Sequence, residues 1–340
     1  MLARHGDDVP DGDGWLFEPK WDGFRGIVFR DAEDGDRLEI WSRNGQSLER
    51  YFPELVIDLK AALPQRCVLD GEIVVQGPKG LEWDRLSQRI HPATSRVLRL
   101  SAEWPAWYIA FDLLALDDDD LLGTPLRRRR GLLVGSLRRH ERVALTPQTD
   151  DPLTARDWFD RFEGAGLDGV VAKRAEGVYA PGERVMVKIK HHRTADCVVG
   201  GYRVHKDGQG AGSLLLGLYD GNGVLHHVGH TSSFTAKERR TLKDELASLV
   251  SDGEEGFGRG RTPGAPSRWT GDKDLSWVRL RPELVCEVHF DQLQEGRFRH
   301  AARLLRWRPD KAPADCTYEQ LEPPHPFALA DIVELGRHPG

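Results

Sequence analysis

The chain has 340 residues, of which 39% are hydrophobic and 30% are charged, and its formal net charge is −6. These proportions are typical of a soluble globular protein, and the length is sufficient for two hydrophobic cores. The negative balance argues against a protein that coats nucleic acid by charge alone, although it permits a local basic face.

No apolar run approaches the roughly 20 residues that span a bilayer, and the opening MLARHGDDVPDGDG is too polar for a signal peptide. The four cysteines lie far apart without a C-x-x-C pair: Cys67, Cys197, Cys286 and Cys316. This spacing predicts neither a zinc site nor a disulfide framework. We therefore expect a cytoplasmic protein that does not contact a membrane.

Short alternating or apolar runs occur between Trp15 and about Lys190, with helix-like stretches between them. They are GIVF, RLEIWS, CVLDGEIVV, WYIAFDLLAL, GVVAKR and VMVKIK. The pattern predicts an α+β domain built on antiparallel sheets over residues 1–192.

Side chains alternate across a strand, so residues of equal parity share a face. In CVLDGEIVV, Asp70 and Glu72 share one face, while Leu69, Ile73 and Val75 share the other. The two carboxylates either bind a metal or a ribose, or they form the wet face of an edge strand. The segment alone favours neither interpretation.

In VMVKIK, Lys188 and Lys190 share a face, where like charges repel unless an anion lies between them. A solvated face is the equal alternative. In GVVAKR, Asp168 lies just before the strand and Lys173 lies within it. In WYIAFDLLAL, parity groups Phe111 with apolar side chains, so the residue is expected in the core by default.

Two charged runs are predicted to be solvated. Asp117 to Asp120 follow a strand and indicate a turn rather than a metal cage, since adjacent side chains diverge. Arg127 to Arg130 belong to a predicted helix whose apolar face includes Leu126, Leu133 and Leu137.

The sequence lacks the usual glycine-rich phosphate cradles, because no G-x-x-x-x-G-K-[ST] occurs and no G-x-G-x-x-G follows a strand. A bound nucleotide would need lysine and arginine side chains to hold its phosphates. The candidates are Arg25, Arg43 in SRNG, Arg184, Lys188, Lys190 and the closing RWRPDK.

A second domain is predicted over residues 193–322, after a polar break. CVVGGYRVH, GSLLLGLYD and VLHHVGHTS indicate three strands, for which a small β-barrel is the expected fold. Thr235 and Glu238 have capping-box spacing and begin a predicted helix that ends at Gly253. Residues 253–271 are expected to form a mobile loop, and residues 323–340 a loosely held tail.

KWDGFR, SRNG, LDGEIV, YIAFDLL, DGVVAKR, VKIK and RWRPDK follow one another in this order from about Trp15 to Cys316. The set resembles the serial motifs of ATP-dependent DNA ligases, within the covalent nucleotidyltransferase superfamily. The spacing and the RWRPDK ending look most like the compact bacterial ligases, either the stand-alone C type or the ligase module of the D type used in end joining. The resemblance implies an adenylation domain followed by an OB-type β-barrel.

The resemblance also implies the reaction and its components. The enzyme would adenylate itself with ATP and Mg²⁺ or Mn²⁺, transfer AMP to the 5′-phosphate of nicked double-stranded DNA, and join that end to the 3′-hydroxyl. This is the chemistry of DNA repair and recombination. A monomer is expected, with repair proteins such as Ku or a polymerase as partners.

The motif EPKWDGFRG makes Lys20 the nucleophile in this resemblance. An ordinary lysine has a pKa of about 10.4, so nearby positive charge or desolvation must neutralise it before it attacks. In this resemblance, Asp22 and Arg25 would adjust the reactivity of Lys20 and would orient the phosphate or the nick. Lys188 and Lys190 would hold the α-phosphate.

The remaining roles also come from the resemblance. Phe111 would stack on adenine, which reverses its core expectation, and Glu18 would lie near the edge of the base. Arg43 and Glu72 would contact the ribose or neighbouring groups, and Glu72 is also a candidate ligand of a metal or a water. Arg184 would bind the phosphate chain.

Asp168 stands where the family usually has a glutamate that serves the metal, and it is one methylene shorter. Coordination through a water is therefore expected. Arg308, Asp310 and Lys311 match the C-terminal motif, in which they would orient the leaving pyrophosphate.

Two alternatives stay open from the residues. An RNA ligase or a capping-type nucleotidyltransferase shares K-x-D-G, although the closing RWRPDK and the spacing argue against it. A noncatalytic nucleic-acid-binding protein with a degenerate site is the second alternative, and the intact motifs argue against that.

Overall fold

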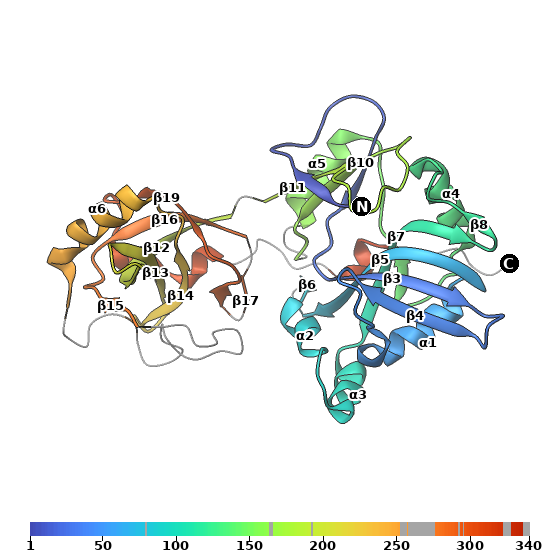
Figure 1. Cartoon of the computed structure of the whole chain (residues 1–340), viewed down its shortest axis with the longest axis horizontal. Helices are drawn as coiled ribbons and strands as arrows, with labels where there is room; N and C mark the ends of the chain where they lie inside the picture. Colours follow the sequence, from blue (N-terminus) through green and yellow to red (C-terminus); the bar gives the residue numbers. More distant parts are fainter. Residues whose placement is uncertain are drawn as a thin grey trace. The chain divides into compact units, whose positions relative to one another are not determined.

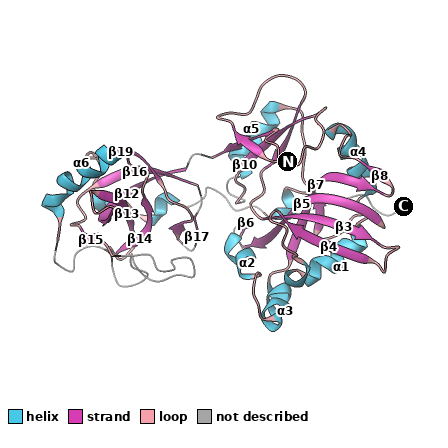
Figure 2. Cartoon of the chain, in the orientation of Figure 1, coloured by secondary structure: helices cyan, strands magenta, loops and turns pink. Residues whose placement is uncertain are grey.

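The structure is a computed structural model of the chain, and it describes residues 1–78, 80–162, 166–191, 193–251, 257, 276–291, 293–294, 296–321 and 328–335. The chain divides into two compact units, Met1–His191 together with Pro323–Gly340, and His192–Glu322 (Figure 1). Both units combine helices with mainly antiparallel sheets, which confirms the predicted α+β class (Figure 2). Within the described ranges, no helix is long and apolar enough to cross a membrane.

The larger sheet of the first unit has the strand order β20-β9-β7-β5-β3-β4, with β6 and β8 paired to β5 and β7. Its strands are β3 (Phe24–Asp31), β4 (Arg37–Ser42), β5 (Arg66–Gly77), β6 (Gly80–Leu81), β7 (Ala106–Leu116), β8 (Asp119–Asp120), β9 (Val143–Leu145) and β20 (Glu334–Leu335). Leu69, Ile73 and Val75 of β5 lie in the core, whereas Asp70 and Glu72 line a pocket on the other face. The predicted alternation of this strand is confirmed.

Helices cover the core face of this sheet. The helical segments of the first unit are η1 (Glu49–Tyr51), α1 (Pro53–Ala62), α2 (Trp83–Gln88), α3 (Thr94–Glu103), α4 (Leu126–Ser136), α5 (Pro152–Phe162) and η6 (Leu329–Asp331). Apolar side chains of α1, α2 and α4, among them Leu55, Leu86 and Leu133, join the same buried cluster as those of β5. Away from this cluster, Asp70 and Glu72 line the pocket, while Val74 and Ile109 join a separate buried cluster with Trp21.

The smaller sheet has the order β1-β11-β10-β2 and consists of β1 (Ala3–His5), β11 (Met186–Lys190), β10 (Gly169–Arg174) and β2 (Trp15–Pro19). Val187 and Ile189 of β11 are buried with Phe17 and with residues of α5. Lys188 and Lys190 lie on the opposite face and line the pocket, so the predicted alternation holds here as well.

The second unit is a curled sheet in the order β14-β13-β12-β16-β19, with β15 paired to β12. It is built from β12 (Arg193–Val204), β13 (Ala211–Tyr219), β14 (Leu225–Thr231), β15 (Val278–Arg279), β16 (Val285–Phe290) and β19 (Arg303–Trp307), beside the hairpin β17 (Leu293–Gln294) and β18 (Arg297–Phe298). A bridge between Thr231 and Ala302 brings the two edges together. The described part of this unit also contains the short 3-10 turns η3 (Ala247–Leu249), η4 (Pro313–Asp315) and η5 (Tyr318–Leu321).

The capped helix of the second unit is α6 (Ala236–Leu246). The Thr235 side chain accepts a hydrogen bond from the Glu238 amide, and Glu238 Oε2 accepts one from the Thr235 amide at 2.6 Å, which confirms the capping box. The α-helix ends at Leu246 rather than at Gly253, because η3 takes over there. The loop predicted over residues 253–271 lies outside the described residues except for Phe257.

Within the tail expected over residues 323–340, the described residues 328–335 are packed rather than loosely held. Leu329, Ile332 and Val333 are buried with Trp21, and β20 pairs with β9 of the large sheet. Burial of these apolar side chains stabilises the segment, a contact that local composition does not reveal.

The acidic run at Asp117 to Asp120 is exposed, as predicted. The prediction for the arginine run is wrong for Arg129 and Arg130, which are buried. Arg129 forms a two-pronged ion pair with buried Asp112, with Nε–Oδ1 at 2.7 Å and Nη2–Oδ2 at 2.9 Å. Arg130 donates to the Thr146 carbonyl oxygen at 2.5 Å.

We expect Arg129→Met to lower the free energy of unfolding by roughly 3–5 kcal/mol, because it leaves the buried Asp112 carboxylate without its partner. The control is Arg128→Met, since Arg128 is exposed on the same helix. Chemical denaturation measures both changes. Equal, small effects of the two substitutions would contradict a structural role for the pair.

Candidate active site

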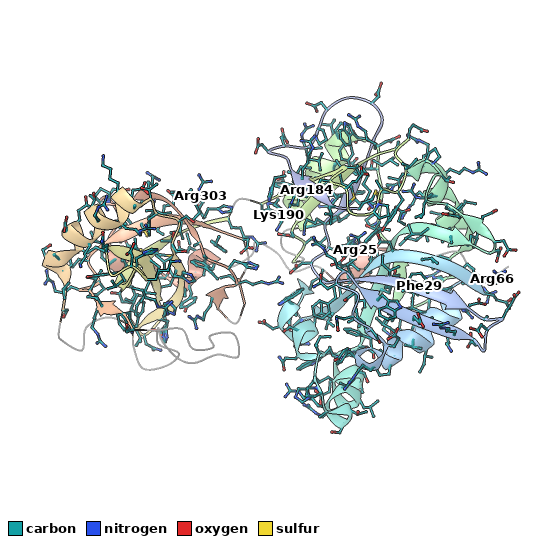
Figure 3. All side chains as sticks on the ribbon, in the orientation of Figure 1. Arg25, Phe29, Arg66, Arg184, Lys190 and Arg303 are labelled. Atoms are coloured by element: carbon teal, nitrogen blue, oxygen red, sulfur yellow. The ribbon has the colours of Figure 1, made fainter. Side chains whose placement is uncertain are left out.

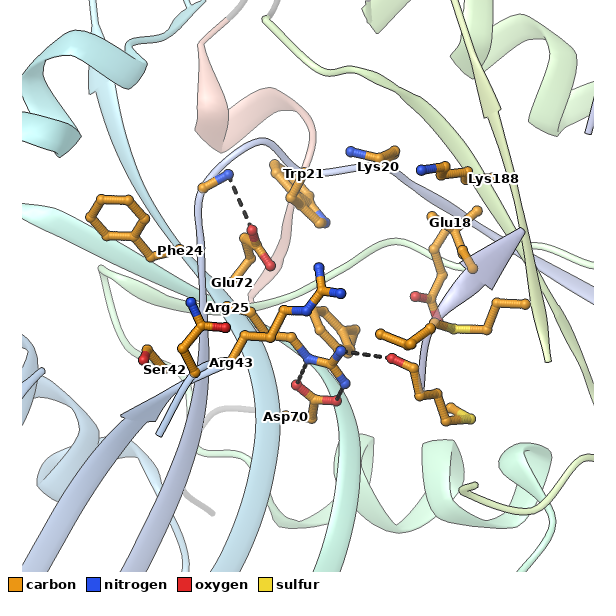
Figure 4. A pocket seen from close by; sticks show the side chains of 18 of the residues that line it. Glu18, Lys20, Trp21, Phe24, Arg25, Ser42, Arg43, Asp70, Glu72 and Lys188 are labelled. Carbon is orange, nitrogen blue, oxygen red and sulfur yellow. Dashed lines mark hydrogen bonds and ion pairs between the residues drawn. The ribbon is translucent and has the colours of Figure 1, made fainter. Parts of the chain in front are cut away.

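The first unit contains a pocket of about 800 Å³ between its two sheets (Figure 4). Nine of the residues predicted from the sequence line it: Glu18, Lys20, Arg25, Arg43, Glu72, Phe111, Arg184, Lys188 and Lys190. Arg25 comes from β3, Lys190 from β11, and Arg184 from the segment before β11 (Figure 3). This volume, and a lining of both apolar and charged side chains, are typical of a site that binds a small molecule.

The backbone of Lys20 is fixed on both sides. Its amide donates to the Gly169 carbonyl oxygen at 2.8 Å, and its carbonyl oxygen accepts from the Asp168 amide at 3.0 Å. Trp21 is buried, and its Nε1 donates to Thr146 Oγ1 at 2.9 Å. The neighbours of Lys20 therefore hold it at the wall of the pocket.

Asp168 bridges two lysines, with Oδ2 at 2.6 Å from Lys20 Nζ and 2.7 Å from Lys190 Nζ. Burial alone would raise the pKa of the Asp168 carboxyl, but the charges of Lys20 and Lys190 outweigh burial and hold this pKa below its ordinary value. Asp168 is itself buried and is not among the residues that line the pocket. It thus acts on the pocket through the lysines.

Lys188 completes a cationic cluster. Burial, followed by the nearby charges of Lys190 and Lys20, lowers the pKa of Lys188. Lys20 and Lys190 share the carboxylate of Asp168, and Lys188 adds a third ammonium group nearby, so the cluster carries excess positive charge that favours an anion such as a phosphate.

Glu72 lies on β5 and accepts a hydrogen bond from the Gly23 amide at 3.1 Å. Burial raises the pKa of Glu72 to about 8, although Lys20 opposes the shift. A raised pKa favours the protonated carboxyl, because burial disfavours the charged form. Gly23 must be glycine here, since a Cβ atom would lie 2.1 Å from the Ile73 carbonyl oxygen.

Arg25 forms an ion pair with Asp70. Its Nε lies 2.9 Å from Asp70 Oδ1 and its Nη2 lies 2.5 Å from Asp70 Oδ2. Arg25 Nη1 also donates to the Met1 carbonyl oxygen at 2.8 Å, and Tyr179 donates its hydroxyl to Asp70 Oδ2 at 2.8 Å. Most of the Arg25 donors are thus used to fix the side chain at the pocket wall.

Asp22 does not line the pocket, although its charge contributes to the raised pKa of Glu72, after burial and Asp70. Arg308 and Lys311 belong to the second unit. Arg308 forms ion pairs there with Asp196 at 2.9 Å and with Asp310 at 2.8 Å.

Phe111 is the extra residue of a β-bulge between β5 and β7. A bulge re-aims the side chain of the unpaired residue. Phe111 accordingly lines the pocket, while Ile109 and Leu113 lie in separate buried clusters. The default placement of Phe111 in the core is therefore wrong.

Sequence reasoning missed the supporting contacts of three side chains at the site, Asp70, Tyr179 and Gln148. Asp70 could have been found as a partner for Arg25, because parity already placed it beside Glu72. Tyr179 and Gln148 carried no signal, since they lie in segments without periodicity and contact Asp70 and Glu18 over 109 and 130 residues of chain.

Two family models match the chain: "ATP dependent DNA ligase domain" over residues 1–190 and "ATP dependent DNA ligase C terminal region" over residues 207–311. DNA ligase C1 of Mycolicibacterium smegmatis is 51% identical over 344 residues, which cover 98% of this chain and 96% of that protein. The multifunctional non-homologous end joining DNA repair protein LigD of Mycobacterium tuberculosis is 33% identical over 333 residues, which cover 94% of this chain and 39% of LigD. A solved Lig E DNA ligase has a TM-score of 0.53 at 17% identity, with 90% of this chain and 98% of that chain covered, a likeness of fold alone.

Proposed function

The chain belongs to the ATP-dependent DNA ligases, and from that premise we propose that Lys20 attacks the α-phosphorus of ATP, releases pyrophosphate and carries AMP as a lysyl phosphoramidate. As a DNA ligase, the protein acts on nicked DNA. The observation that carries the assignment of Lys20 is its place at the pocket wall, hydrogen-bonded to Asp168 at 2.6 Å and grouped with Lys188 and Lys190.

The cationic cluster suits the first chemical step. Attack requires a neutral Lys20 amine, and the positive charges of Lys188 and Lys190 lie beside it. The same charges stabilise the negative charge that develops on the α-phosphate in the transition state. Asp168 orients the Lys20 amine through its hydrogen bond.

The other pocket residues would hold the rest of the nucleotide. We assign Phe111 and Glu18 to adenine, Arg43 and Glu72 to the ribose and its surroundings, and Arg184 to the phosphate chain. Arg25, fixed by Asp70, would face the phosphate or the nick, and Asp22 would act on the site through Glu72.

The carboxylates fit a divalent ion held partly by substrate. Among the residues with described positions, no three His, Cys, Asp or Glu side chains gather as a metal site. Mg²⁺ is commonly held by one or two carboxylates plus substrate phosphates, so Glu72 and Asp168 are sufficient in number. We assign Asp168 to coordination through a water, because two lysines already occupy its carboxylate. When bound, Mg²⁺ or Mn²⁺ would supply positive charge beside the α-phosphate.

We assign adenylation to residues 1–192, an OB-type DNA-binding barrel to residues 193–322, and the C-terminal segment to residues 323–340. The two matched family regions and the two compact units support this division. Action as a cytoplasmic monomer, with Ku or a polymerase as partners, is also part of the proposal. The similarity to an end-joining repair protein supports a role in DNA repair.

Labelled ATP and GTP test the proposed function. ATP should label the protein covalently, the label should pass to a 5′-phosphorylated nick, and a metal chelator should prevent labelling. Labelling by GTP in place of ATP would favour a capping-type enzyme, and absence of any covalent nucleotide would favour a noncatalytic DNA-binding protein.

Lys311→Ala should slow formation of lysyl-AMP at least about tenfold but largely spare the sealing of a nick that already carries 5′-adenylate. Lys311 is proposed to act on pyrophosphate, and a bound group lowers a barrier only in steps whose transition state contains it. Single-turnover sealing of pre-adenylated DNA without ATP separates the steps. Lys243→Ala, on the exposed face of α6, is the control. An equal, large loss in both assays would show that Lys311 supports the fold or grips DNA.

A further inference from the structure

Glu18 is a buried carboxylate, 3% exposed, that lines the pocket. Resting on the proposed adenine site, we propose that Lys173 and Gln148 determine nucleotide specificity by holding Glu18 as a fixed acceptor for the 6-amino group of adenine.

The pairing of β2 with β10 places Lys173 beside Glu18. Glu18 lies opposite Val171 and Leu16 lies opposite Lys173, so Lys173 is the diagonal neighbour of Glu18 on the same face. Lys173 Nζ lies 2.6 Å from Glu18 Oε2, and both side chains are buried. Without such a partner, a carboxylate buried this deeply would carry an uncompensated charge.

Gln148 holds the other oxygen of the same carboxylate. Its Nε2 donates to Glu18 Oε1 at 2.7 Å. The position of Gln148 follows from a backbone bridge between Phe17 and Thr149, whose amides donate to each other's carbonyl oxygens at 2.8 and 3.1 Å. Both Glu18 oxygens are therefore fixed by donors from two different segments.

Lys173 also connects the carboxylate to the aromatic wall. Its Nζ lies 4.7 Å from the centroid of the Phe111 ring, a cation–π contact. One ammonium group thus contacts both the Phe111 ring, which would stack on the base, and the Glu18 carboxylate, which would accept a hydrogen bond from the edge of the base.

The chemistry of this arrangement favours a donor at position 6 of the purine. An ionised carboxylate only accepts hydrogen bonds, and each oxygen can accept more than one. The 6-amino group of adenine can donate to Glu18, whereas a 6-oxo group would bring an acceptor against the carboxylate. A 6-hydrogen purine would leave the carboxylate without this bond.

The test compares ATP with purine riboside triphosphate, which has hydrogen in place of the 6-amino group, and with inosine triphosphate. The wild-type kcat/KM for self-nucleotidylation should favour ATP at least about tenfold over both analogues, as expected for a hydrogen bond to a charged group. Gln148→Leu and Lys173→Met should reduce this preference to within about threefold, mainly by raising KM for ATP. Lys173→Arg should retain part of the preference, because it keeps the charge.

Lys237→Met, an exposed residue of α6, is the control and should leave the preference unchanged. If Lys173→Met does not fold, the result for Gln148→Leu is sufficient for the test, because Gln148 is only half-buried. The inference is overturned if Glu18→Gln removes the preference for ATP while Gln148→Leu and Lys173→Met retain it; the adenine site would then still stand. If the wild type does not distinguish ATP from the 6-hydrogen analogue and Glu18→Gln changes nothing, the adenine site itself fails.

Discussion

Replacing Lys20 by arginine is expected to abolish self-adenylation as completely as replacing it by alanine. A guanidinium group has a pKa above about 12, so it cannot supply a neutral nitrogen for attack on the α-phosphate. Arginine would keep the positive charge beside Asp168, which separates the loss of the nucleophile from the loss of the ion pair. Transfer of label from ATP to protein is the measurement.

Lys60→Arg is the matched control, because Lys60 is a partly exposed lysine that pairs with Asp36 at 2.9 Å. It should label as the wild type does. Persistent lysyl-AMP in Lys20→Arg or Lys20→Ala would show that another residue makes the attack.

Asp168→Ala should slow nucleotidyl transfer at least about 100-fold, because it removes both the proposed metal contact and the carboxylate that orients Lys20. Asp168→Glu should keep much of the activity, since it restores the side-chain length usual in the family while keeping the charge. Rates measured across a range of Mg²⁺ concentrations distinguish the two contributions.

If Asp168 serves the metal, the alanine variant should require more Mg²⁺ than wild type to reach its reduced maximum. An unchanged Mg²⁺ dependence would leave only the contacts with Lys20 and Lys190. Full activity of Asp168→Ala at limiting Mg²⁺ would remove the metal role altogether.

The sequence predicted much of the pocket wherever a regular strand carries the residues. Glu72 lines the pocket on β5, and Lys188 and Lys190 line it on β11, as strand alternation predicts. Alternation is a local property of the backbone, so it can be read from a short segment.

The same reasoning failed where a distant contact decides the outcome. At Phe111 a bulge shifts the register of β7 against β5. At Arg129 the deciding partner is Asp112, 17 residues away. Gln148 reaches Glu18 through a bridge between segments that are remote in sequence. Such contacts depend on the assembled fold, and no local periodicity indicates them.

Mass spectrometry of the protein after incubation with ATP and Mg²⁺, followed by peptide mapping, tests the central assignment most directly. The account predicts one added AMP on the peptide that contains Lys20, attached to Lys20 itself, and loss of the adduct when nicked DNA is supplied. An AMP located on Lys188, Lys190 or any other residue, or a protein that seals nicks without ever carrying AMP, would contradict it.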